Sequence, residues 1–105
     1  MASQADPSKR VELCHQQKGD PWIFIEAAVD DKGNLVLSGQ ELGKSVHEFW
    51  GDDDYEYWLL VSKEHKDRLL LALIKRLYAG NTNAVSDLKE WLRENDIPST
   101  FDSYA

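Results

Sequence analysis

The segment YEYWLLVSKEHKDRLLLALIKRLYAG, residues 55–80, contains the transition that decides the fold class. Its first part, 55–61, carries aromatic or aliphatic side chains on both faces of an extended chain, which is typical of an interior strand. From residue 69 onward the apolar side chains recur at helical spacing and make one wide stripe. They are Leu69, Leu70, Leu73, Ile74, Leu77 and Tyr78. The chain therefore changes here from a strand-forming half to a helix-forming half.

The ends of this first helix carry recognisable signals. Ser62 is the expected N-cap, because its hydroxyl can accept a hydrogen bond from a free backbone N–H of the first turn. Lys75 and Arg76 lie near the C-terminal end, where the helix dipole favours cations. Gly80 suits the left-handed position that commonly follows a helix.

A second helix is predicted from Asn83, its expected N-cap, to about Asn95. Its apolar stripe consists of Val85, Leu88, Trp91 and Leu92. Pro98 prevents its continuation, because proline lacks the backbone donor. The residues that follow, 99–104, alternate in a way that predicts a final short strand.

The first half contains the other strand signals. Residues 10–17 alternate Val11, Leu13 and His15 with polar neighbours, which predicts a half-buried strand. The apolar runs 22–29 and 35 onward are separated by DDKGN, a polar loop with glycine that predicts a hairpin. Residues 42–49 fit either a short helix or a loop.

These elements follow the order β-β-β-(short helix or loop)-β-α-α-β. Strands grouped before helices indicate an α+β fold, with an antiparallel sheet of four to five strands and two helices packed on one face. We expect residues 1–10 to form a flexible N-terminal arm and residues 11–105 to form a single domain.

Composition narrows the partners and the compartment. Twelve basic against 19 acidic residues give a net charge of −7, which disfavours nucleic acid and anionic membranes and favours a basic protein partner. No apolar run reaches the roughly 20 residues of a membrane span, and the first ten residues lack the apolar stretch of a secretory signal. Cys14 is the only cysteine, so no intrachain disulfide can form. We therefore expect a cytoplasmic protein.

Catalytic motifs are weak. Cys14 and His15 are neighbours, but in a strand their side chains point to opposite faces. The histidines at 15, 47 and 65 lack the i, i+4 spacing of a helical zinc pair. The sequence favours a non-enzymatic protein without catalytic residues or cofactor. A small enzyme that uses Cys14 or a carboxylate pair is the alternative.

Two segments invite a metal interpretation. DDKGNLVLSGQE, residues 30–41, begins and ends like an EF-hand loop, but it has Lys32 where a ligand belongs and Leu35 where the turn needs glycine. A hairpin turn fits it better. The acidic run at 52–56 supplies two or three local carboxylates, which suits weak, exchangeable cation binding rather than a dedicated site.

The segment FWGDDDYEYWLL, residues 49–60, is the candidate functional surface. In an extended chain, Asp52, Asp54 and Glu56 would share one side, opposite Asp53 and Tyr55. Aromatic anchors beside carboxylates are typical of protein-binding surfaces, whereas a solvated turn is the alternative interpretation. The predicted protein-binding residues are Phe49, Trp50, Asp52, Asp53, Asp54, Tyr55 and Glu56.

Residues 35–61, with GQELG and FWGDDDYEYW, resemble a segment of small acidic bacterial proteins of unknown function. The resemblance implies no activity, but it suggests that Gly39, Gly43 and Gly51 occupy positions of positive φ. The leading hypothesis is a protein-binding module, by analogy with toxin-neutralising (immunity-type) proteins. A homo-oligomer that hides an exposed edge strand is left open.

Overall fold

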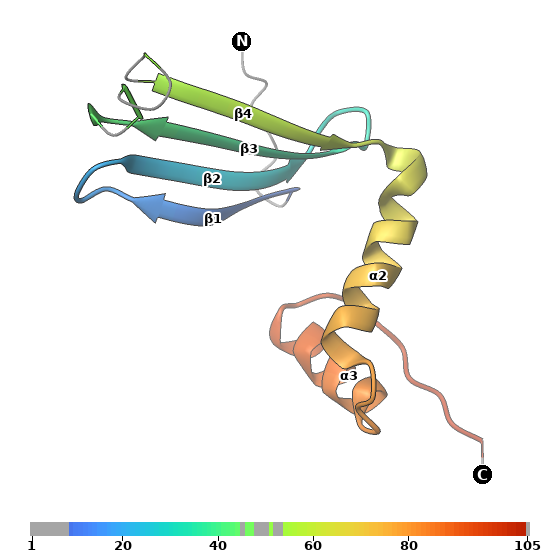
Figure 1. Ribbon diagram of the computed structural model, residues 1–105. Coiled ribbons are helices and arrows are strands. Elements are labelled where there is room, and N and C mark those ends of the chain that lie inside the picture. The colour runs from blue at the N-terminus through green and yellow to red at the C-terminus, as the bar shows by residue number, and fades with distance from the viewer. Residues whose placement is uncertain (1–8, 45, 48–50, 52–53, 105) are drawn as a thin grey trace. The chain divides into compact units, whose positions relative to one another are not determined.

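The computed structural model describes residues 9–44, 46–47, 51 and 54–104. Contacts between Cα atoms group the chain into two compact units, and the boundary falls between Arg68 and Leu69. The first unit holds a four-stranded antiparallel sheet, and helices follow the sheet along the chain (Figure 1). The α+β class is thus confirmed. The single domain and the packing of the helices on one face of the sheet stay predictions.

The sheet is a meander in which each strand pairs with the next one in the chain (Figure 1). Its strands, in order, are β1 (Arg10–Gln16), β2 (Trp22–Val29), β3 (Leu35–Leu42) and β4 (Asp54–Val61). All three pairings are antiparallel, and β2 pairs with β3 and β3 with β4 without a shift in register. Residues that face each other across these strands therefore lie on the same side of the sheet.

The turn between β2 and β3 is organised by one carboxylate. Asp30 Oδ1 accepts hydrogen bonds from the backbone N–H groups of Lys32 and Asn34, each at 2.9 Å. Gly33 takes φ of +85°, and its N–H donates to the Asp30 carbonyl. The Asn34 side chain in turn accepts from the N–H of Lys63 at 3.0 Å. The hairpin turn predicted here is confirmed, and Asp30 serves the backbone of that turn.

A β-bulge in β1 changes the predicted alternation. Glu12 pairs with Glu26, but Cys14 already pairs with Ile25, so the register shifts between them. An extra residue in one strand of a pair moves all later side chains to the other face. The prediction that Val11, Leu13 and His15 share a face was therefore wrong, because His15 lies on the same side as Glu12.

The pairing of β3 with β4 contains a close contact between Gly39 and Tyr57, which face each other. A methyl group added to Gly39 would overlap the Tyr57 ring. Gly39 is therefore required because it leaves room for a ring, and the suggestion that its φ is positive was wrong. Gly43 and Gly51 do have positive φ, at +137° and +82°.

The segment between β3 and β4 begins with a helical turn. The N–H of His47 donates to the carbonyl of Gly43 at 3.2 Å, and the N–H of Gly51 donates to the carbonyl of His47 at 2.8 Å. Val46 lies in this turn and is only 3% exposed, so it is buried in the first unit. Residues 45 and 48–50 lie outside the described residues.

After β4 the chain forms a 3-10 turn, η2 (Lys63–His65), and then α2 (Lys66–Tyr78). Ser62 occupies the N-cap position as predicted, and its Oγ accepts from the N–H of Glu64 at 3.3 Å. Gly80 follows α2 with φ of +81°. The predicted C-terminal end of the helix is thus confirmed, whereas Ser62 caps the 3-10 turn, and α2 itself begins four residues later.

The second helix, α3 (Ala84–Glu94), begins after Asn83, but the Asn83 side chain makes no capping hydrogen bond. Asn81 organises this turn instead. Its Oδ1 accepts from the N–H of Asn83 at 2.8 Å, and its Nδ2 donates to Asp87 at 2.9 Å. The position of the cap was therefore predicted correctly, but the side chain that stabilises it was not.

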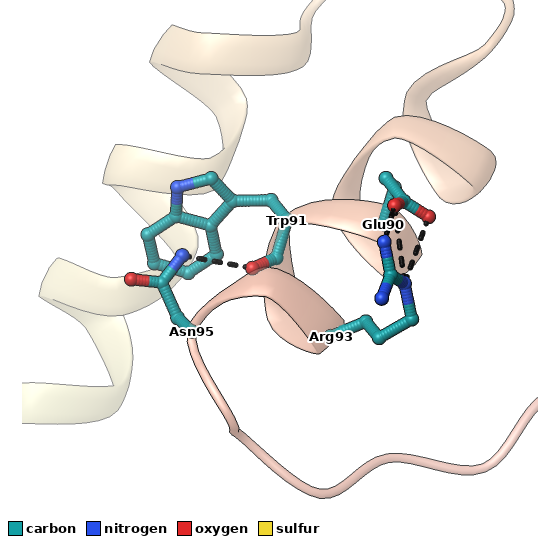
Figure 2. Close-up of polar contacts among 4 residues, drawn as sticks. All are labelled: Glu90, Trp91, Arg93 and Asn95. Carbon is teal, nitrogen blue, oxygen red and sulfur yellow. Dashed lines mark hydrogen bonds and ion pairs between the residues drawn. The ribbon is translucent and has the colours of Figure 1, made fainter.

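Local polar contacts close the C-terminal end of α3 (Figure 2). The Arg93 guanidinium pairs with Glu90, and Asn95 Nδ2 donates to the carbonyl of Trp91 at 2.8 Å. Asp96 takes φ of +57°, and the N–H of Ile97 donates to the carbonyl of Leu92 at 2.9 Å. This bond to a carbonyl five residues back is the helix-ending arrangement that satisfies a free carbonyl.

The final strand predicted at 99–104 is not formed in the described residues. Phe101, the apolar residue in the middle of this stretch, instead lies beside α3, with Lys89 Nζ 4.6 Å from its ring centroid. The prediction was wrong because a short alternation needs a strand partner, whereas this ring has a helix as its neighbour.

Replacing Gly39 by alanine should lower the free energy of unfolding by about 1–3 kcal/mol, because the new methyl group overlaps the Tyr57 ring. Urea denaturation measures this change. The matched control is Ser38→Ala, the neighbouring position on the opposite face, which should change stability by less than about 0.5 kcal/mol. Equal effects of the two substitutions would contradict the close contact.

The turn at Asp30 predicts a pH dependence. The hydrogen bond from the N–H of Asn34 holds the pKa of the Asp30 carboxyl below its ordinary value. A lowered folded-state pKa stabilises the protein above the unfolded-state pKa of about 3.9, and this stabilisation is lost as the pH falls through the folded-state value. Between pH 7 and pH 2, the wild type should therefore have a larger free energy of unfolding than the Asp30→Asn variant. This difference should disappear at the acid end of the range. An advantage independent of pH would contradict this explanation.

Candidate functional site

The strand register gathers aromatic and acidic side chains on one side of the sheet. Four rows of facing residues cross it, and one of them contains His15, Phe24, Gln40 and Glu56. We call this side the aromatic–acidic face and define it by eight residues. They are His15, Trp22, Phe24 and Trp58 together with Glu12, Glu26, Asp54 and Glu56.

Three rings at the β1–β2 end of this face form a cluster. The His15 ring meets Trp22 and Phe24 edge-on, with centroids 5.8 and 5.3 Å apart and interplanar angles of 85°. Trp22 and Phe24 lie 6.4 Å apart at 20° to each other. Edge-to-face contacts of this kind stabilise ring pairs beyond the area that they bury. The three rings thus form one aromatic surface at this end of the face.

Carboxylates surround the rings and outnumber the cations beside them. Arg10 Nε lies 3.6 Å from Glu26, and His15 Nδ1 lies 3.3 Å from Glu12. Gln40 Nε2 donates to Asp54 Oδ1 at 3.2 Å. The face thus carries four carboxylates, and the Arg10 guanidinium lies beside one of them. The field over the face is therefore negative, which attracts cations.

A shallow depression of about 150 Å³ lies at the centre of this face. It is lined by Phe24, Ser38, Gly39, Gln40, Glu56 and Trp58. Trp58, on its β4 side, is 66% exposed, although large aromatic side chains usually bury most of their surface. Sites for drug-sized ligands run from about 300 to 1,000 Å³, so this depression suits one side chain of a partner rather than a cofactor.

The opposite face of the sheet is mainly apolar. Its side chains include Ile23, Ile25, Val29, Leu35, Leu37, Tyr57, Leu59 and Val61. Tyr57 donates its hydroxyl to Glu41 Oε2 at 3.3 Å, and burial, followed by the Glu41 charge, raises the pKa of the Tyr57 hydroxyl. This face has the composition of a surface that packs in a core.

The structure separates the predicted protein-binding residues. Asp54 and Glu56 lie on the aromatic–acidic face, whereas Tyr55 lies on the apolar face with its ring centroid 5.2 Å from that of Tyr57. The alternation expected for an extended chain is confirmed for these three. Phe49, Trp50, Asp52 and Asp53 lie outside the described residues. The protein-binding role itself stays a prediction.

Three aromatic members of the face were missed at the level of sequence. Trp22 and Phe24 belong to an apolar run, and Trp58 belongs to a segment with the pattern of an interior strand, so neither pattern indicates an exposed aromatic side. The signal was present, because Trp22, Phe24 and Glu26 recur at a period of two. It could be recognised only with the register that sets them beside Glu56.

The geometry of the described residues does not assemble a catalytic site around Cys14 or a metal site. Cys14 pairs with Ile25 and His15 with Phe24, so these neighbours lie on opposite faces. No group of three or more His, Cys, Asp or Glu side chains within the described ranges could hold a metal ion. None of the helices in the part of the chain that the structure describes has the length and apolar character needed to cross a bilayer.

Comparison with known proteins leaves the chain without a relative to guide the interpretation. It matches no protein-family model, no curated protein and no solved structure. The function must therefore be argued from the site alone.

The exposure of Trp58 predicts that this ring contributes little to stability. Trp58→Thr keeps a β-branched residue in the strand and should cost less than about 1 kcal/mol of unfolding free energy. Tyr57→Thr, at the next position on the apolar face, should cost about 2 kcal/mol or more. Urea denaturation at low protein concentration measures both. A larger loss at Trp58 than at Tyr57 would assign Trp58 to the core.

Proposed function

We propose that the protein is a non-enzymatic binding module that docks a basic protein partner on its aromatic–acidic face. The observation that carries the proposal is the exposed Trp58 ring beside Glu56, at the edge of a depression with room for one side chain. Exposed tryptophans are enriched among the residues that dominate protein interfaces.

The chemistry of the face favours an arginine or a lysine of the partner. A cation over the Trp58 ring gains cation–π attraction, and the same cation can pair with Glu56. The wider negative field of the face and the net charge of −7 would speed the encounter with a basic protein. The same charge repels nucleic acid and anionic membranes, which we therefore exclude as partners.

We propose a cytoplasmic location for this binding module, because its lone cysteine suits a reducing compartment, whereas bacterial origin rests on the resemblance of residues 35–61. Toxin-neutralising proteins of the immunity type offer a functional analogy, since an acidic protein of that class complements the charge of a basic nuclease. This part of the proposal rests on charge and on analogy by class.

Reversing charge on the face should abolish capture of the basic partner. Immobilised Glu56→Lys/Trp58→Thr protein is compared with the wild type in pull-downs from the source-cell extract at about 0.05 and 0.5 M salt. We expect the wild type to retain a basic protein at low salt, and the double variant to retain at least about tenfold less of it. Quantitative mass spectrometry measures the recovery.

Glu64→Lys is the matched control, because it makes the same charge change in η2, outside the aromatic–acidic face. It should retain the partner nearly as well as the wild type. Equal loss with the control would show that net charge alone decides recovery. Equal recovery by all three proteins would refute the assignment of this face.

A further inference from the structure

The β4 strand forms an edge of the sheet, because it pairs with β3 and with no other described strand (Figure 1). Its C-terminal half carries Trp58, Leu59 and Leu60, which are 66%, 60% and 59% exposed. The strand contains no proline, lysine or bulge. A long, regular and apolar edge of this kind offers its backbone groups to another strand.

The other edge of the sheet differs. The β1 strand has a bulge between Glu12 and Cys14, and its first residue is Arg10. A bulge hinders strand addition, and β1 has one, whereas the pairing of β4 with β3 has no shift in register. Addition is therefore favoured at β4 alone, and growth through a single edge gives a closed pair rather than a fibre.

The charge pattern of β4 disfavours a parallel copy of the strand more than an antiparallel one. Its acidic residues lie toward the start, whereas Trp58 to Val61 are uncharged. A parallel copy would place equal charges side by side. An antiparallel copy places the acidic half of each strand against the apolar half of the other. This pattern favours a second copy of the same chain as the occupant of the edge.

Charge also selects the register. When Trp58 faces the Trp58 of a second copy, Glu56 faces Leu60, and the two Glu56 side chains are offset by about 14 Å along the strands. When Tyr57 faces its own copy, this offset falls to about 7 Å, within the screening length of about 8 Å at physiological salt. A shift in the other direction shortens the paired segment. The register centred on Trp58 is therefore favoured.

We propose that two copies of this chain pair through β4 in an antiparallel, two-fold arrangement centred on Trp58. This pairing makes one continuous eight-stranded sheet. Tyr57 then faces Leu59 of the other copy on the apolar side, and Trp58 faces Trp58 on the aromatic–acidic side. Aromatic–aromatic and aromatic–aliphatic pairs are among those that stabilise neighbouring strands. The proposal is independent of the basic partner.

Pairing through one strand buries less surface than the 1,200–2,000 Å² of standard stable interfaces. The dimer should therefore be in equilibrium with the monomer at micromolar to millimolar concentrations. Sedimentation equilibrium and light scattering over this range measure the dissociation constant.

Two charge variants at Leu60 test the register. Leu60→Glu sets a carboxylate opposite Glu56 of the second copy and should weaken the dimer by about tenfold, since the contact occurs twice. Leu60→Lys sets an ammonium opposite the same carboxylate and should leave the dimer as tight as the wild type or tighter. Glu56→Lys/Leu60→Glu exchanges the two charges and should restore the affinity that Leu60→Glu loses.

A wild-type protein that stays monomeric up to about 1 mM would overturn the proposal, as would equal weakening by Leu60→Glu and Leu60→Lys. Circular dichroism confirms that each variant retains its strands, which the exposure of Leu60 leads us to expect. The outcome is separable from the proposed function. A monomer that captures the basic protein refutes the dimer alone, whereas a dimer that captures none refutes the binding role alone.

Discussion

The contact between Gly39 and Tyr57 is the constraint on which the organisation of the first unit depends. The Tyr57 ring lies over Gly39, where no other residue type leaves room for it, and its hydroxyl reaches Glu41 two positions along the same strand. A slip of one residue between β3 and β4 would lose both interactions and would exchange the two faces of β4. Because this pairing keeps its register, Glu56 and Trp58 lie together with Phe24 on the other side of the sheet.

The two sides of this short meander differ in composition. One side is mainly aliphatic and carries the half-buried Tyr57, as a surface that packs in a core does. The other side exposes rings among carboxylates, which hydrate readily while the rings stay accessible to a partner. If β4 also pairs with a second copy, the aromatic–acidic faces of both copies would join along the shared edge.

The candidate site was predictable only in part. The period of two placed Asp54 and Glu56 together and Tyr55 apart, as the structure has them. The contribution of Trp22, Phe24 and His15 was not predictable, because it requires long-range pairing and a bulge that no local pattern announced. The same reason explains the error at 99–104. Alternating polar and apolar residues form a strand only where another strand is available to pair with them.

The sequence by itself determined the elements and most of their ends. Ser62 caps the 3-10 turn that leads into the first helix, and Gly80 follows that helix. Asp30 and Gly33 make the hairpin turn, and the change of period after residue 61 gives the α+β class. These are local effects, since each depends on backbone conformation or on hydrogen bonds within a few residues. Only the tertiary structure decided which side chains share a face, because strand register is fixed by contacts such as Gly39 with Tyr57 that join residues distant in the chain.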